Sequence, residues 1–162
     1  MKSAATRVIG VGQPAAGDDG AGIAVVRALR EGYWLPSGVE IHETTDPGQL
    51  IDLLDGIRRA IVVDALVSDE RPGTIRCLAP DQLSRYPRAP FSCHGMGVAE
   101  AIGLARALAA DGAGIDIRIV GVTIKPPAGY SCALSSSVAA ALPLAASLIL
   151  ELLTGENTGT CA

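Results

Sequence analysis

Residues 7–22 read RVIGVGQPAAGDDGAG, and this stretch decides the fold. It starts as a short apolar run, passes through a glycine-rich turn and enters a segment in which Ile23, Val26 and Leu29 recur at a spacing near 3.6. A strand that turns directly into a helix is the first half of a strand–helix–strand unit. The opening therefore predicts a parallel sheet covered by helices.

The rest of the chain repeats this alternation. Further strands are predicted at residues 39–43, 60–65, 74–78 and 115–124, and helices at residues 47–56, at 134–153 and from His94 or Gly95 to Leu108. The run 60–65 is apolar throughout, which is typical of a central strand covered on both faces. We predict one domain over residues 1–162, an α/β three-layer sandwich with a twisted, mostly parallel sheet of about five strands and helices on both faces.

Composition and charge narrow the possible partners. Hydrophobic residues make up 49% of the chain but aromatic residues only 3%, so the core must consist of Ala, Val, Leu and Ile. The net charge is −4 and the basic residues are scattered, which argues against nucleic acid and anionic membranes. The N-terminal apolar run is too short for a signal peptide, and the stretch 138–150 falls short of the roughly 20 residues that span a bilayer. We expect a cytoplasmic monomer.

The cysteines indicate no metal or redox motif. Cys77, Cys93, Cys132 and Cys161 are far apart and form no Cys-x-x-Cys pair. This spacing predicts neither a zinc knuckle nor a redox dithiol. We expect reduced thiols, as in most intracellular proteins.

The glycine-rich turn is compatible with two kinds of site. Residues 10–15, GVGQPA, fit the start of the dinucleotide-binding fingerprint. Against this, Pro14 lacks an amide donor, and Asp18 and Asp19 put negative charge where a pyrophosphate would bind. One aspartate is expected to cap the helix. Asp19 is then available for a site at the carboxyl end of the first strand, where open α/β sheets bind ligands.

Asp64 and His94 are the other candidate site residues. Asp64 closes an apolar run, and a buried carboxylate is costly, so it either sits at an exposed strand end as a turn former or meets a cation. His94 precedes a predicted helix. Two carboxylates and one imidazole at one sheet edge suit a divalent metal with open positions, and could equally serve as general acids and bases. We predict that Asp19, Asp64 and His94 lie within a few Å of one another.

A cysteine nucleophile at Cys93 is a less favoured alternative. Cys93 adjoins His94, but neighbouring side chains on an extended backbone point in opposite directions, which disfavours a thiolate–imidazole pair. The other histidine, His42, lies within an alternating strand and is interpreted as a surface residue.

The sequence resembles the hydrogenase maturation endopeptidases over nearly its whole length. Residues 8–14 (VIGVGQP) and 17–22 (GDDGAG) look like the family's Gly-x-Gly-Asn turn followed by Asp-(Asp or Glu)-Gly-x-Gly. The later matches, in order, are TDPGQL at 45–50 with the leucines 53 and 54, VDA at 63–65, RPGT at 71–74, SCH at 92–94 and ALS at 133–135. The family fold, a five-stranded sheet between helices, agrees with the fold predicted above.

The resemblance implies an endopeptidase that removes the C-terminal extension of a nickel–iron hydrogenase large-subunit precursor. Asp19, Asp64 and His94 match the family's three metal-contacting positions. Nickel would arrive already bound to the precursor, and cleavage would require it. Either the metal would polarise the scissile carbonyl or a carboxylate would activate the water. The alternative function is a nickel-sensing maturation chaperone that binds the precursor without cutting it.

Two departures from the family pattern and one loop bear on substrate choice. Gln13 stands where the family usually has Asn, and residues 125–127 (KPP) replace a stretch that often carries an acidic residue. Residues 79–92 contain three prolines and are predicted to form a mobile surface loop that helps to receive the precursor. Deleting residues 84–88 is expected to weaken processing while leaving the melting temperature nearly unchanged.

Overall fold

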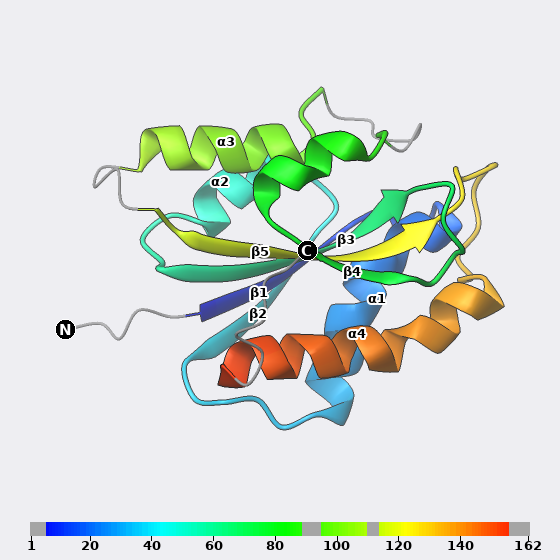
Figure 1. The fold of residues 1–162 in the computed structure, drawn as a ribbon, viewed down its shortest axis with the longest axis horizontal. Helices are drawn as coiled ribbons and strands as arrows, with labels where there is room; N and C mark the ends of the chain where they lie inside the picture. Colours follow the sequence, from blue (N-terminus) through cyan, green and yellow to red (C-terminus); the bar gives the residue numbers. More distant parts are fainter. Residues whose placement is uncertain (1–5, 89–94, 110–113, 156–162) are drawn as a thin grey trace.

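The structure is a computed structural model and describes residues 6–88, 95–109 and 114–155. Its centre is a five-stranded sheet in the order β2-β1-β3-β5-β4 (Figure 1). The first four of these strands are parallel, and β4 pairs antiparallel with β5 at one edge. The strands are β1 (Thr6–Val11), β2 (Val39–Thr44), β3 (Arg59–Val67), β4 (Ile75–Leu78) and β5 (Asp116–Ile124).

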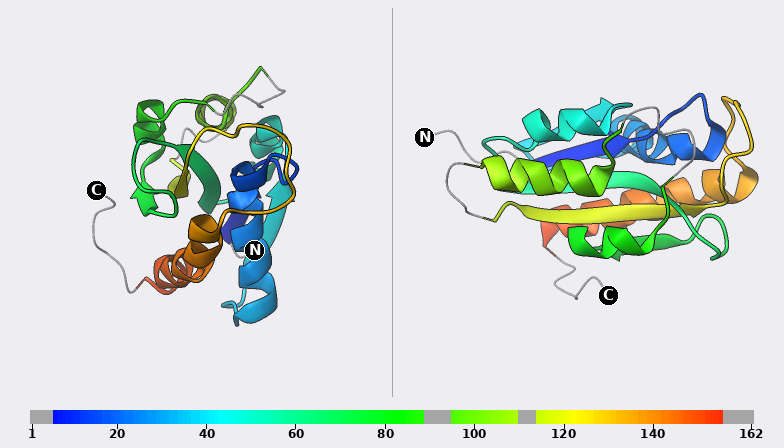
Figure 2. Two further views of the ribbon diagram at one scale, coloured as in Figure 1. Left: turned by 90° about the vertical axis from the view of Figure 1, so that its right-hand side faces the viewer. Right: turned by 90° about the horizontal axis from the view of Figure 1, so that it is seen from above.

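Helices cover both faces of the sheet (Figures 1 and 2). One face carries α1 (Ala21–Gly32) and α4 (Ser136–Thr154), and the other carries α2 (Leu50–Leu53) and α3 (Val98–Leu108). Three single-turn or two-turn 3₁₀ helices complete the fold: η1 (Gly17–Gly20), η2 (Pro47–Gln49) and η3 (Pro80–Arg85). The predicted three-layer α/β sandwich with a mostly parallel sheet is confirmed.

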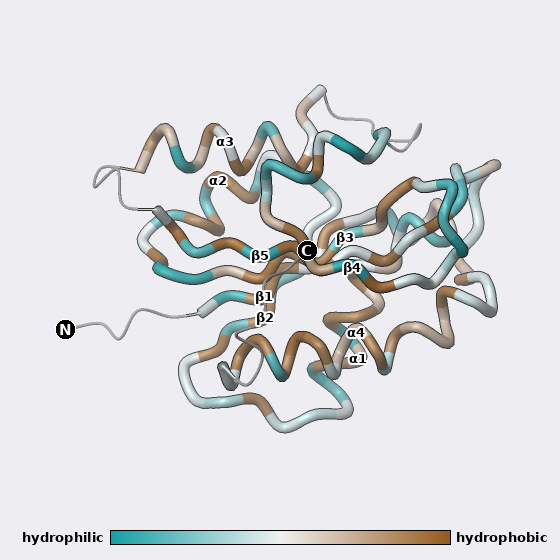
Figure 3. The backbone as a smooth tube through the Cα atoms, viewed as in Figure 1, coloured by the Kyte–Doolittle hydropathy of each residue, from teal (hydrophilic) through white to brown (hydrophobic). Residues whose placement is uncertain are grey.

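The core has two halves because the central strands are buried on both faces. Ile61 and Val63 pack in the cluster under α1 and α4, whereas Ala60 and Val62 pack in the cluster under α2 and α3. All four are fully buried. This explains the uninterrupted apolar run in the sequence, and Figure 3 shows the same concentration of hydrophobic residues along the middle strands.

At its carboxyl end β3 extends beyond its pairing with β1, so the last residues of β3 have a strand partner on one side only. The β1–β3 ladder ends at the pair Gly10 and Val63, while the β3–β5 ladder continues to Val67 and Ile124. β3 thus extends two residues beyond the carboxyl end of the predicted run 60–65, and one residue before its start. Asp64 lies inside a strand rather than at its end, but just past the point where β1 stops pairing with it.

Glycine at position 22 permits α1 to lie close over this part of the sheet. A Cβ atom there would come within 2.3 Å of the carbonyl oxygens of both Val11 and Val63. Real Cβ contacts are longer, so only glycine fits. The GDDGAG segment therefore serves packing as well as the candidate site.

Three sequence predictions need correction. Residues 80–85 form η3, with Leu83 buried and Tyr86 packed on the core, so the predicted irregular loop is wrong there. The helix predicted to begin at His94 or Gly95 begins at Val98. Cys77 is disulfide-bonded, which contradicts the expected reduced state, whereas Cys132 is free and exposed.

The last helix, α4, is a single helix with Pro143 inside it. Its 19 residues are long and apolar enough to cross a membrane by length and composition. One side of it packs into the core cluster through Val138, Ala145 and Ile149, which is how the core helix of a folded domain is built.

Candidate active site

Asp19 and Asp64 both line a cleft of about 350 Å³ at the carboxyl edge of the sheet. Asp19 comes from η1, which follows the glycine-rich turn after β1, and Asp64 comes from β3. The remaining walls are the end of β1, the turn before η2, the segment after η3 and the first turn of α3. The sequence thus correctly predicted that the two carboxylates converge at this edge.

Asp64 is the more strongly perturbed acid. Its Oδ1 accepts a hydrogen bond of 2.9 Å from the N–H of Ala65. Burial and, to a smaller extent, the negative charge of Asp19 together raise the pKa of Asp64 to about 8. At neutral pH and without a cation, Asp64 therefore holds a proton.

Asp19 is also perturbed, but one contact stabilises its charged form. Burial raises the pKa of Asp19, and the N–H of Gln13 partly offsets this by donating to Oδ2 at 3.1 Å. Because Asp64 is the more desolvated of the two, Asp19 ionises first. Two desolvated carboxylates in one cleft favour a bound cation, which would relieve the cost of ionising both.

Asp18 has a different role from Asp19. Its Oδ1 accepts a hydrogen bond of 2.7 Å from the N–H of Ser135, the residue that precedes α4. The same turn is tied to the segment before α4 at Ser131, whose O accepts from Gly17 N–H at 2.6 Å and whose N–H donates to Ala15 O at 2.8 Å. The predicted capping of the following helix by an aspartate is therefore wrong: neither η1 nor α1 has a side-chain cap, and Asp18 instead ties the turn to the N-cap residue of α4.

The geometry of the glycine-rich turn argues against the dinucleotide-binding alternative. The N–H of Gln13 points at the Asp19 main-chain and side-chain oxygens, at 3.3 and 3.1 Å, so it is not available for a phosphate. A Cβ atom at Gly12 would lie 2.2 Å from the Asp19 carbonyl oxygen, so this glycine admits η1 rather than a pyrophosphate. The turn is built to present Asp19.

His94 and Cys93 lie outside the described residues, so the third ligand and the cysteine alternative stay predictions. Within residues 6–88, 95–109 and 114–155, no group of three or more His, Cys, Asp or Glu side chains could hold a metal ion. The described part of the site is therefore a carboxylate pair. Gly97 and Val98 line the cleft, so the chain that follows His94 does reach it.

Sequence reasoning missed an ion pair on the wall of the cleft. Arg88, after η3, pairs with Glu100 in the first turn of α3, and both line the cleft. Glu100 also accepts the N–H of Gly97 and so caps its own helix. The signal was a Gly-x-x-Glu spacing at residues 97–100. Because Arg88 and Tyr86 hold this segment in place, deleting residues 84–88 would disturb the fold as well as the cleft.

Comparisons with known proteins point to one family. A family model described as hydrogenase maturation protease matches residues 23–152. Protein FrxA of Pyrococcus furiosus is 34% identical over 140 residues, covering 85% of this chain and 96% of that protein. A putative hydrogenase maturation protease of Methanocaldococcus jannaschii is 36% identical over 102 residues, and the match spans 61% of this chain and 66% of the relative.

A solved structure supports the same assignment. The hydrogenase maturating endopeptidase HybD from Escherichia coli superposes with a TM-score of 0.72 and 25% identity over 94% of each chain. The family match covers well over half of the sequence and includes Asp64 on β3. The chain belongs to the hydrogenase maturation protease family, as its sequence motifs predicted.

Proposed function

We propose that the protein is an endopeptidase that removes the C-terminal extension of a nickel–iron hydrogenase large-subunit precursor once nickel is in place. The observation that carries this proposal is the desolvated carboxylate pair Asp19 and Asp64 in an open cleft, in a chain of the hydrogenase maturation protease family. The protein is expected to act in the cytoplasm as a monomer.

The carboxylate pair fits a metal that comes with the substrate. Carboxylates accept divalent ions of intermediate hardness, and a pair with one imidazole leaves coordination positions open for the ligands that the precursor supplies. Two carboxylates and one imidazole bind a free ion weakly, so we expect them to bind an ion that the precursor already holds. Asp19 and Asp64, with His94 as the expected third ligand, would dock around that nickel.

The reaction itself is hydrolysis of one peptide bond. The water oxygen bonds to the scissile carbonyl carbon, the C–N bond breaks, and the leaving amine takes a proton. A metal beside the carbonyl would stabilise the developing negative charge, and an ionised carboxylate beside the water would accept its proton. Docking of the nickel requires Asp64 to lose the proton that it holds in the free protein.

Site variants test this proposal. Asp19→Asn and His94→Ala should each stop release of the C-terminal peptide from a nickel-loaded precursor, while their far-ultraviolet circular dichroism stays as in the parent protein. Asp52→Asn, on the exposed side of α2, is the matched control and should process normally. Full release by both site variants would exclude the proposed site. Binding of the precursor by the parent protein without any release would instead indicate a chaperone.

A further inference from the structure

We infer that the open side of β3 at Ala65 and Val67 is a docking edge on which an extended segment of the precursor, next to the scissile bond, pairs as an added strand. This inference rests on the proposed function, because it names a peptide of the precursor as the occupant. It concerns how that peptide is held, which the family assignment leaves undefined.

The strand register defines the open edge. On one side, β3 pairs with β5 as far as Val67, but on the other side its pairing with β1 stops at Val63. Successive residues of a strand direct their N–H and C=O groups to opposite neighbours. Ser68 N–H donates to Ile124 O of β5, so the main-chain groups of Ala65 and Val67 face the side that β1 has left.

The main-chain N–H of Ala65 has a side-chain acceptor in place of a strand partner. Its N–H donates to the side chain of its own neighbour Asp64 at 2.9 Å, where a strand partner would normally supply a carbonyl oxygen. In the described residues, no strand pairs with Val67 on this side. Unpaired main-chain groups along a strand are a template for pairing with another chain.

The edge and the candidate active site form one continuous surface. The cleft that holds Asp19 and Asp64 is also lined by Ala65 and Leu66. Neighbouring strands lie about 4.8 Å apart, so a peptide paired with this edge would continue the line of β1. β1 itself leads into η1 and Asp19, and β3 carries Asp64. A peptide on this line would therefore lie beside the elements that present the two carboxylates.

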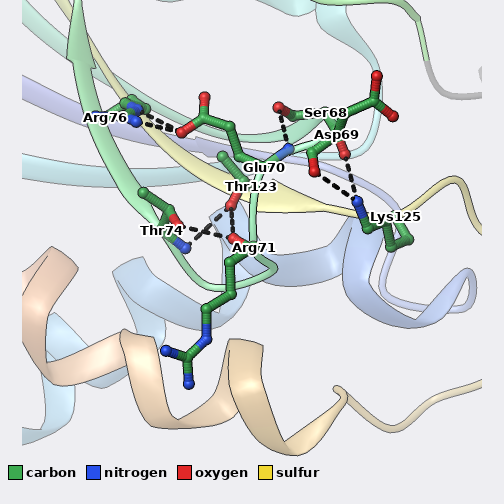
Figure 4. Close-up of polar contacts among 8 residues, drawn as sticks. All are labelled: Ser68, Asp69, Glu70, Arg71, Thr74, Arg76, Thr123 and Lys125. Carbon is green, nitrogen blue, oxygen red and sulfur yellow. Dashed lines mark hydrogen bonds and ion pairs between the residues drawn. The ribbon is translucent and has the colours of Figure 1, made fainter.

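Hydrogen bonds order the turn that directly follows this edge, at residues 68–71 (Figure 4). Lys125, after β5, donates from Nζ to the carbonyl oxygens of Ser68 and Asp69 at 3.2 and 2.9 Å. The buried hydroxyl of Thr123 donates to Arg71 O at 2.7 Å. A binding edge that is already ordered loses little conformational entropy when a peptide pairs with it. Lys125, one of the departures from the family pattern, thus has a structural role.

Hydrogen exchange at single amides tests the edge directly, with the purified nickel-loaded large-subunit precursor as the probe. In the free protein the Val67 amide should exchange fast and the Leu66 amide, which faces β5, slowly. Bound precursor should slow exchange at Val67 by at least about tenfold and leave Leu66 unchanged. A Val67 amide that is already protected in the free protein, or that stays unprotected in the complex, overturns the inference.

A pair of variants provides the second measurement. Val67→Pro removes only the N–H on the open side and keeps the bonds to β5, which is where strands tolerate proline. It should weaken binding of the precursor by at least about tenfold, whereas Val67→Ala, which keeps the N–H, should bind within about twofold of the parent protein. Equal binding by the two variants overturns the inference, and if Val67→Pro does not fold, the exchange experiment decides.

The outcomes separate this inference from the proposed function. Protection of Val67 without peptide release supports the docking edge and overturns the peptidase. Release without protection supports the peptidase and overturns the docking edge. A precursor that is neither bound nor cleaved overturns both.

Discussion

Replacing Asp64 by Asn should stabilise the metal-free protein at neutral pH. The pKa of Asp64 rises from its ordinary value of 3.8 to about 8 on folding, mainly through burial. A carboxyl whose pKa is raised in the folded state contributes stability below the unfolded pKa, and this contribution is lost as the pH rises through the folded pKa. Asn cannot ionise, and its carbonyl oxygen can still accept the N–H of Ala65.

The size of the effect follows from the two pKa values. One pKa unit corresponds to about 1.4 kcal/mol, so the parent protein should lose up to roughly 4 kcal/mol of unfolding free energy between about pH 4 and pH 7 through Asp64 alone. Asp64→Asn should match the parent protein near pH 4 and exceed its stability increasingly up to about pH 8. Glutamates with lowered pKa values, such as Glu43 and Glu70, affect both proteins equally and cancel in the difference.

Urea unfolding followed by circular dichroism, with a chelator present, measures this difference at each pH. Asp55→Asn, an exposed acid in the turn after α2, is the control and should show no pH-dependent gain over the parent protein. If Asp64→Asn and the parent protein had parallel stability curves from pH 4 to pH 8, Asp64 would not be desolvated and the proposed carboxylate pair would lose its physical basis.

Three further predictions concern the scaffold of the site. Asp18→Ala should lower the free energy of unfolding by about 1 kcal/mol, because it removes the acceptor for the Ser135 N–H, whereas Asp18→Asn should retain most of the parent stability. Urea titrations measure both, and equal stability of the two variants would contradict a role for this hydrogen bond. Gly22→Ala should lower the free energy of unfolding by about 2 kcal/mol or more through the clash with Val11 and Val63. Gly103→Ala, on the exposed side of α3, should raise it by up to about 1 kcal/mol, and equal effects of the two changes would contradict the close packing of α1. Leu83→Ala should lower both the melting temperature and the rate of processing, because Leu83 is only 8% exposed and packs in the core cluster under α3. An unchanged melting temperature would indicate that this segment serves the substrate and not the core.

The layers of the fold were predictable because the apolar pattern is local. A strand buried on both faces must be apolar at every position, and residues 60–63 show this without ambiguity. Two carboxylates at the carboxyl ends of neighbouring parallel strands had to lie at the same edge, so the convergence of Asp19 and Asp64 followed from the topology. The alternation of strands and helices gave that topology.

What the sequence did not reveal depends on contacts between distant residues. Asp18 and Ser135 are 117 residues apart, and no local pattern indicates that one accepts the main-chain N–H of the other. The prolines in residues 79–92 suggested an irregular loop, but proline at the first position of a helical turn is compatible with η3, and burial of Leu83 stabilises that turn. Asp64 was expected at a strand end because a charged residue interrupts the apolar run, yet the pairing of β3 with β5 carries the strand past it.

The nickel dependence of peptide release tests the central claim most directly. The nickel-loaded and nickel-free forms of one large-subunit precursor would be incubated with the protein, and the C-terminus of each would be followed by mass spectrometry. We predict that the loaded form loses its C-terminal extension and that the nickel-free form stays whole, because Asp19 and Asp64 form a pair that gains most from a cation already placed in the substrate. Equal cleavage of the two forms would contradict the account.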